Sequence, residues 1–359
     1  MMKKLVAFFL LIALFHSCQS NKEEVPEFLL FPIATEVIDS CYLFELINAD
    51  DSCLIASLLQ SSSQLVSIPI DNYGLNLSKS DFFLNKGRGN LEILSGRFDV
   101  YHDTLHVLST TSNGIDKVIE IPLNHTDDAS FWNVVKTPYF QTVYPGLNVN
   151  VLKDGLYLFS GGYIGSESVA CYANIENGVI NELDYWPEDG VAVNSVVKHQ
   201  MYTSESKVFW NEGKILYVCG NGCFALLLDH NTQEVTYLYD EYPKYSEAND
   251  GLNFIKEPKC SLGMYSFTSQ NSIYLAPILS KIVNGDYQPD NFKGYPPYYT
   301  DRIDVFSWEG KKLGTLSLAN PFSNFIVNEQ ARKLFALSEN LITFEQEVHI
   351  YDLSLLDFN

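Results

Sequence analysis

From about residue 35 onward, short apolar and aromatic runs alternate with Gly, Asn, Asp and Pro, a pattern typical of antiparallel all-β proteins. One element recurs: a turn residue or charge, then an apolar-aromatic-apolar run that ends in a small or polar residue, as in Leu105–Ser109 and Ile215–Cys219. Its copies are centred near positions 55, 106, 157, 217, 274 and 335. A repeat of about 50 residues with about four short strands predicts a propeller blade. Six copies predict an all-β, six-bladed β-propeller.

Turn chemistry supports the same architecture. Asn177-Gly178 and Glu309-Gly310 each separate two apolar runs, as the turn of a β-hairpin does. No Pro/Gly/Ser-rich linker divides the chain, so we expect a single propeller domain over residues 35–359, after a leader (1–17) and a polar tether (18–34). Longer spacings predict insertions at 183–202, 241–261 and 279–300. The alternatives are a pair of β-sandwiches or an irregular barrel.

The N-terminus reads as a secretory signal. Lys3 and Lys4 precede the apolar run Leu5–Phe15, which is too short to cross a bilayer as a helix. Cys18 follows at the point where this run gives way to polar residues. This arrangement resembles a bacterial lipobox, although Phe15 and His16 depart from its usual residues. The resemblance implies cleavage before Cys18 and acylation of its sulfur. A soluble secreted protein and an uncleaved anchor are the alternatives.

Lys22-Glu23-Glu24 is similar to the short acidic signal that sends some Bacteroidota lipoproteins to the outer face of the outer membrane. A solvated tether would have the same composition. The expected location is therefore the bacterial cell envelope, as an outer membrane lipoprotein on either the periplasmic or the surface face. The expected membrane contact runs through the lipid on Cys18.

The cysteines give a weaker signal. Six remain after Cys18, and only Cys219 and Cys223 lie close together, around Gly220-Asn221-Gly222. Structural zinc would require two further ligands at a matching spacing, which the sequence lacks. The two glycines indicate a tight turn between strands at 215–218 and 224–228. Free thiols and a disulfide both stay open, and no cofactor is expected.

Charge excludes one class of partner. The 359 residues include 44 Asp+Glu against 23 Lys+Arg, for a formal net charge of −21. Such a surface repels a phosphate backbone, so we expect no nucleic-acid partner. With 46% hydrophobic residues, the chain has the composition of a folded protein.

The segment Phe82–Glu92 carries a family resemblance. Its Gly87-Arg88-Gly89-Asn90-Leu91-Glu92 is similar to the G-x-G-x-x-E element of Bacteroidota lipoproteins with a TolB-like six-bladed propeller. The resemblance implies an envelope location and a binding or scaffold role. From the residues themselves, Gly87 and Gly89 predict a turn, with Arg88 and Glu92 available to pair or to bond loops across it.

No nucleophile elbow, zincin helix motif or EF-hand loop occurs in the sequence. A propeller can still gather distant residues at its channel, so a metal-assisted, lactonase-like hydrolase or lyase is the alternative function. The residues available for it are ordinary polar positions that no motif singles out: His102, His106, Asp154, Glu167, Asn194, His199 and Asp301.

Two groups of tyrosines favour binding instead. Tyr295, Tyr298 and Tyr299 lie in a Pro-rich insertion, and Tyr242 and Tyr245 lie beside Asp240 and Glu241. Tyrosines on loops offer apolar area with a polar tip, which suits a sugar or a protein surface. Packing of these rings back onto the blades is the alternative. The sequence therefore predicts a non-enzymatic binding or interaction module with an unknown protein or glycan partner.

Overall fold

The structure is a computed structural model of the 359-residue chain. It describes residues 25–39, 41–59, 61–71, 74–112, 114–137, 144–153, 155–163, 165–175, 177–257, 262–278, 281–283, 286–288 and 298–356. The leader, Cys18 and Tyr295 lie outside these residues. No helix within them is long and apolar enough to span a bilayer.

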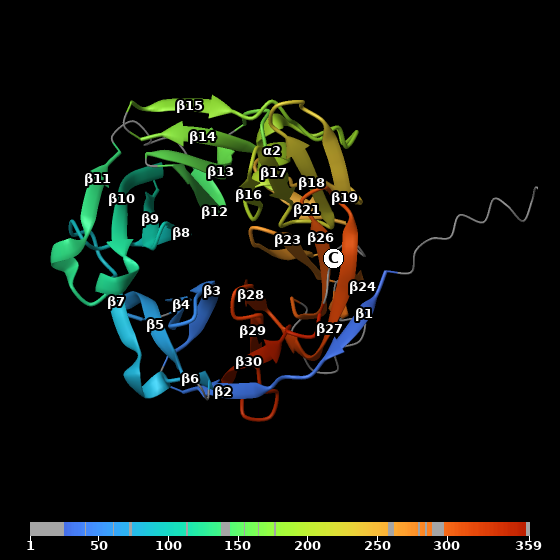
Figure 1. The fold of residues 1–359 in the computed structure, drawn as a ribbon. Coiled ribbons are helices and arrows are strands. Elements are labelled where there is room, and N and C mark those ends of the chain that lie inside the picture. The colour runs from blue at the N-terminus through green and yellow to red at the C-terminus, as the bar shows by residue number, and fades with distance from the viewer. Residues whose placement is uncertain are drawn as a thin grey trace, which may run out of the picture.

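Six small antiparallel sheets form a ring in sequence order, which confirms the six-bladed β-propeller (Figure 1). From the channel outward, the first three blades are β3 (Leu43–Ala49), β4 (Cys53–Leu58), β5 (Ser63–Asp71) and β7 (Asp81–Asn85), with β6 (Gly74–Leu75) also on β5; β8 (Ser95–Tyr101), β9 (Thr104–Thr111), β10 (Gly114–Pro122) and β11 (Asn133–Lys136); and β12 (Tyr144–Lys153), β13 (Leu156–Gly162), β14 (Ala170–Asn174) and β15 (Val179–Glu182).

The other three blades are β16 (Lys207–Asn211), β17 (Lys214–Val218), β18 (Phe224–Asp229) and β19 (Val235–Asp240); β22 (Gly263–Thr268), β23 (Ser272–Ile278), β26 (Thr300–Ser307) and β27 (Lys312–Phe322); and β28 (Asn324–Asn328), β29 (Lys333–Glu339), β30 (Gln346–Asp352) and β2 (Ala34–Ile38). The predicted insertions hold α2 (Ser195–Thr203) and the hairpins β20 (Tyr245–Glu247) with β21 (Phe254–Lys256) and β24 (Lys281–Val283) with β25 (Asp286–Gln288). Short 3-10 turns occur at Leu77–Lys79, Leu123–His125 and Ala129–Phe131.

The N-terminal segment closes the ring. β2 pairs antiparallel with β30 and so supplies the outer strand of the last blade. β1 (Glu27–Leu30), within the range expected to be tether, pairs parallel with β27 as an extra strand on the fifth blade. Buried Ile38 packs with residues of the first and sixth blades. The first and last segments of the described chain therefore hold each other in place.

The core consists of six hydrophobic clusters, one between each pair of neighbouring blades. The second strand of each blade contributes to two of them. In β17, Ile215 and Tyr217 pack toward the third blade, whereas Leu216 and Val218 pack toward the fifth. Because both faces are buried, the whole strand is apolar. This explains the recurring sequence element, whose six copies are the second strands of the six blades.

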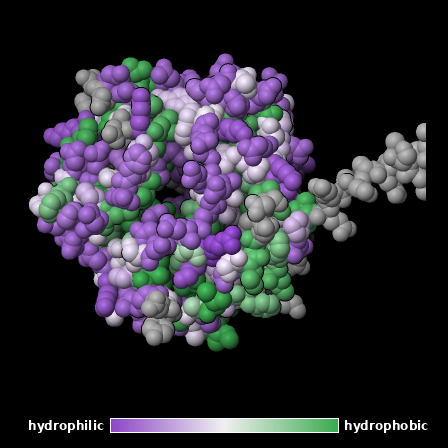
Figure 2. Space-filling model, viewed as in Figure 1, coloured by the Kyte–Doolittle hydropathy of each residue, from purple (hydrophilic) through white to green (hydrophobic). Residues whose placement is uncertain are grey.

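The surface is mostly hydrophilic on the face shown in Figure 2, where polar residues border a hollow at the centre of the ring. Apolar side chains gather at the lower right, over the part of the ring where β1 lies in Figure 1. Leu29, Phe31 and Ile33 are exposed along this N-terminal segment.

Candidate binding site at the channel mouth

The innermost strands of all six blades enclose a central chamber of about 210 Å³. Polar residues on these strands face it, chiefly Glu45, Asp99, Asn148, Asn150, Lys207 and Asn324. Inner strands have one face toward the neighbouring blades and one toward the channel. Their sequences therefore mix apolar and polar residues.

Amide side chains join neighbouring blades around this chamber. Asn148 accepts a hydrogen bond from the backbone N–H of Val208 at 2.8 Å, and both Asn148 and Asn150 donate to the Val208 carbonyl. Asn324 accepts from the Leu46 N–H at 2.9 Å. These amides are therefore engaged in holding adjacent blades together.

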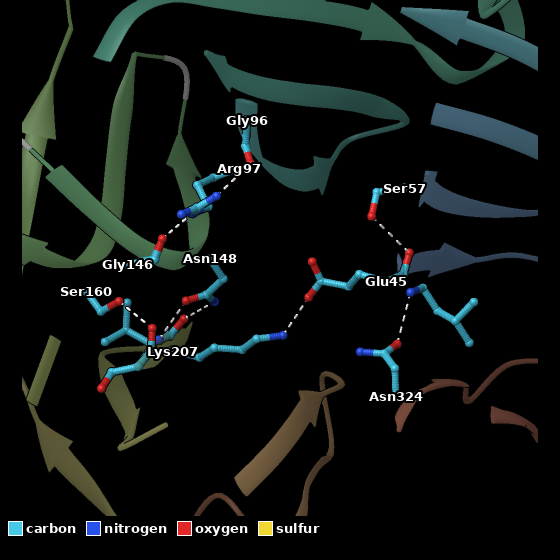
Figure 3. A network of polar contacts seen from close by, with 12 residues as sticks. Glu45, Ser57, Gly96, Arg97, Gly146, Asn148, Ser160, Lys207 and Asn324 are labelled. Carbon is cyan, nitrogen blue, oxygen red and sulfur yellow. Dashed lines mark hydrogen bonds and ion pairs between the residues drawn. The ribbon is translucent and has the colours of Figure 1, made fainter. Parts of the chain in front are cut away.

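An ion pair spans the channel between opposite blades (Figure 3). Glu45 lies on β3 of the first blade and Lys207 on β16 of the fourth, and their side chains point toward one another across the ring. The Lys207 Nζ lies 2.7 Å from the Glu45 Oε1. Both residues line the chamber and also the pocket above it, so the pair forms a partition between the two spaces.

Two further charged groups surround this partition. Arg97 donates through Nε to the Gly146 carbonyl and through Nη1 to the Gly96 carbonyl at 3.0 Å. Burial lowers the pKa of Arg97, and the Glu45 charge opposes that shift. Asp99 accepts a hydrogen bond from the Val151 N–H at 2.7 Å. The protein around the chamber raises the pKa of Asp99 to about 7 because its charge is poorly solvated there.

A larger pocket of about 450 Å³ opens at one mouth of the channel, where the inner strands β3, β16, β22 and β28 begin. We call it the mouth pocket. Glu45, Lys207 and Asn324 lie at its boundary with the chamber. The rest of its lining is mainly apolar and aromatic: Tyr42, Leu43, Phe44, Leu59, Leu262, Met264, Tyr265, Ile278, Tyr298, Tyr299 and Leu337, with Glu205, Gly220, Ser323 and Gln346.

The rings of the mouth pocket differ in exposure. Phe44 is 62% exposed and Tyr298 46%, and Tyr42 and Leu59 are exposed too. Tyr299 is buried beneath them, with its ring centroid 5.2 Å from that of Tyr298. Tyr265 fixes the Tyr298 backbone by donating to its carbonyl at 2.7 Å. The pocket thus combines exposed apolar rings with a fixed wall behind them.

Backbone packing also shapes this wall. The Gly263 Cα lies so close to the fourth blade that a Cβ there would be 2.0 Å from the Gly220 carbonyl oxygen, and its φ is +146°. Only glycine fits both conditions. The fourth and fifth blades can therefore approach closely at the edge of the mouth pocket.

The structure brings together two of the five tyrosines proposed from the sequence. Tyr298 and Tyr299 line the mouth pocket, and Tyr295 lies outside the described residues. Tyr242 stacks on Phe224 at a centroid distance of 4.7 Å, at the cluster between the third and fourth blades. Tyr245 is buried in the same cluster.

Asp189 explains the burial of Tyr245. Its carboxylate accepts hydrogen bonds at 2.9 Å from the hydroxyls of both Tyr202 and Tyr245, and Lys198 lies 3.3 Å away. These bonds join the 183–202 insertion to the β20–β21 hairpin. Tyr245 therefore holds two insertions together.

The polar candidates for catalysis do not converge on the channel. His106 contacts Tyr157 and Glu120 in the second and third blades, His199 lies on α2, and Asn194 caps that helix by accepting from the Val197 N–H. Asp154 lies outside the described residues. Among the residues that are described, no group of three or more His, Cys, Asp or Glu is placed to hold a metal ion.

The remaining motifs serve local structure. Cys41, Cys53, Cys171, Cys219 and Cys223 are free thiols. Glu92 accepts from the Gly89 N–H at 2.8 Å and so stabilises the predicted glycine turn. Lys117 donates to the Gly89 carbonyl across it.

Sequence reasoning missed Tyr42, Phe44, Glu45 and Lys207. The alternation Tyr42-Leu43-Phe44 places two rings on one side of a strand, which is a usable signal. Glu45 and Lys207 carry no local signal, since they are 162 residues apart and meet only when the ring closes.

No protein-family model and no curated protein matches this sequence. Solved structures do share its fold. One is a member of the DUF4221 family from Bacteroides vulgatus, with a TM-score of 0.52 and 11% identity over 90% of this chain and 96% of that one. Another is a putative exported protein from Bacteroides fragilis, with a TM-score of 0.51 and 10% identity over 90% and 98% of the two chains. At these identities the likeness shows the fold alone.

Proposed function

We propose that this protein is a non-enzymatic interaction module of the bacterial cell envelope, held to the outer membrane by a lipid on Cys18. Its partner is a protein that inserts an apolar side chain into the mouth pocket. The leader and the cysteine that follows it support the anchoring, as does the similar fold of a putative exported protein.

The mouth pocket is the observation that carries the binding role. Exposed rings beside a concave apolar pocket are the usual form of an anchor site, because a partner side chain that fills the pocket releases water from several apolar surfaces at once. The Glu45–Lys207 pair lies across the channel beneath it. An inserted group would meet a floor there and stop.

The test places a photo-crosslinking amino acid at position 44 of the full chain, expressed in its own host. The matched control carries it at Tyr163, which is 42% exposed on the third blade. We expect a discrete crosslinked protein at position 44 that is absent at 163. Binding of that protein, once purified, should be weakened by Tyr298→Ala and unchanged by Tyr163→Ala. The same crosslinks at both positions, or equal affinity for both variants, would reject the mouth pocket as the site.

Anchoring has a separate test. Growth with an alkyne-tagged fatty acid should label the wild-type chain, and Cys18→Ser should abolish both the label and membrane retention. A labelled Cys18→Ser variant, or an unlabelled wild type, would contradict lipid attachment at this residue.

A further inference from the structure

A second groove lies between the third and fourth blades, away from the mouth pocket. It encloses about 710 Å³ and is open to solvent. Three rings line it: Tyr172 on β14, Trp210 on β16 and His230 in the turn after β18. None of these residues lines the chamber or the mouth pocket.

The three rings hold one another in place. Tyr172 and Trp210 meet at an interplanar angle of 82° with centroids 6.4 Å apart, and His230 packs against both at similar angles. The Tyr172 Oη and His230 Nδ1 are 3.1 Å apart, within hydrogen-bond distance. Because these rings are already fixed, a ligand that binds them orders few side chains and loses little affinity to that cost.

Trp210 keeps its polar group available. The indole N–H groups of Trp132 and Trp308 donate to backbone carbonyls at 3.0 and 3.1 Å. No such bond is found for the Trp210 N–H in the part of the chain that the structure describes. An indole usually finds a partner when buried, so a donor at an open groove remains free for a ligand.

Polar side chains accompany the rings. Asn181 is directly opposite Tyr172 in the β14–β15 ladder and so lies on the same face of the sheet. Asn181, Glu182 and Asp184 are exposed and line the groove. The groove therefore offers ring surfaces together with an amide and carboxylates that can bond hydroxyl groups.

We propose that this groove binds a neutral oligosaccharide. A sugar ring has an apolar C–H face that packs on Trp or Tyr and hydroxyls at its edge that reach amides and carboxylates, which is the combination present here. The carboxylates in the groove and the net charge of −21 disfavour a polyanionic glycan. The depth of the groove accommodates more than one sugar residue.

The test uses the full-length protein and a panel of unsubstituted neutral gluco-, manno- and galacto-oligosaccharides, with binding followed by saturation-transfer NMR and calorimetry. We expect saturable binding of at least one member. Trp210→Phe and Asn181→Ala should each weaken it about fivefold, the size expected for one lost hydrogen bond. Trp132→Phe is the matched tryptophan control and should leave the affinity unchanged, as should Tyr298→Ala in the mouth pocket.

Three results would overturn the proposal. One is the absence of saturable binding across the panel. The second is binding that Trp210→Phe and Asn181→Ala leave intact, which would place the sugar elsewhere. The third is binding of tetramethylammonium but of no sugar, which would make the rings a cation site instead.

Discussion

Replacing Lys207 by Met tests whether the ion pair across the channel stabilises the ring. The substitution keeps an unbranched apolar side chain and removes the ammonium that lies 2.7 Å from Glu45. The Lys207 and Glu45 side chains are only 17% and 26% exposed, so water can replace the lost partner only in part. Opposite blades would then lose their direct polar connection.

The expected loss lies between two limits. Exposed ion pairs contribute about 0.2–1 kcal/mol, and breaking a fully buried pair costs about 3–5 kcal/mol. A mostly buried pair with one short charged hydrogen bond should therefore cost about 2 kcal/mol on removal of Lys207. Glu45→Gln keeps an acceptor oxygen for the ammonium and should cost about 1 kcal/mol.

Urea unfolding, followed by tryptophan fluorescence and circular dichroism, measures these losses. The double variant closes a mutant cycle, in which we expect a coupling of about 1 kcal/mol. Lys214→Met is the control, since Lys214 lies 3.3 Å from a Glu309 that is 75% exposed, and it should cost under about 0.5 kcal/mol. A Lys207→Met variant as stable as Lys214→Met, or a cycle with no coupling, would refute the stabilising role.

Three further predictions concern other parts of the ring. Because the pKa of Asp99 is raised to about 7, its native carboxyl holds a proton more tightly than the unfolded chain does, and stability is lost as pH rises from about 4 to 7; Asp99→Asn should reduce this loss in urea titrations at pH 5 and 8, and an unchanged slope would contradict it. Gly263→Ala should lower stability by more than about 2 kcal/mol, since its Cβ would meet the Gly220 carbonyl, whereas Gly190→Ala, with no atom within 4 Å, should cost about 1 kcal/mol in the same assay. Ile38→Ala should cost about 2–4 kcal/mol by thermal unfolding if β2 closes the ring, and a loss below about 1 kcal/mol would argue against closure.

The fold could be predicted because its strongest sequence signal has a direct structural cause. The second strand of each blade is buried on both faces between two neighbouring blades, so runs such as Ile215–Val218 carry no polar interruption. Copies of such a run at regular intervals leave few architectures other than a ring of blades. The hairpin turns at Gly178 and Gly310 also form as expected, with φ of +71° and +82°.

The site was less predictable because its residues look ordinary along the chain. Inner strands such as β8 and β12 place Asp99 and Asn148 in the channel, and in sequence these polar residues resemble solvent-facing positions. Tyr298 carried a signal because its insertion is rich in proline and tyrosine. Tyr245 carried a similar signal but lies in the core, since burial depends on Asp189, a partner 56 residues away.

The closure of the ring by β2 also has a consequence for the order of folding. The hydrogen bond between Thr35 and His349 joins residues 314 positions apart, so β2 has no partner until almost the entire chain has been synthesised. Until then, the sixth blade lacks its outer strand and the first strand presents an unpaired edge, which is prone to pair with other chains. Bringing such distant segments together is slow. We therefore expect the last step of folding to be the joining of the two ends, and a chain truncated before β30 to remain an open, aggregation-prone arc.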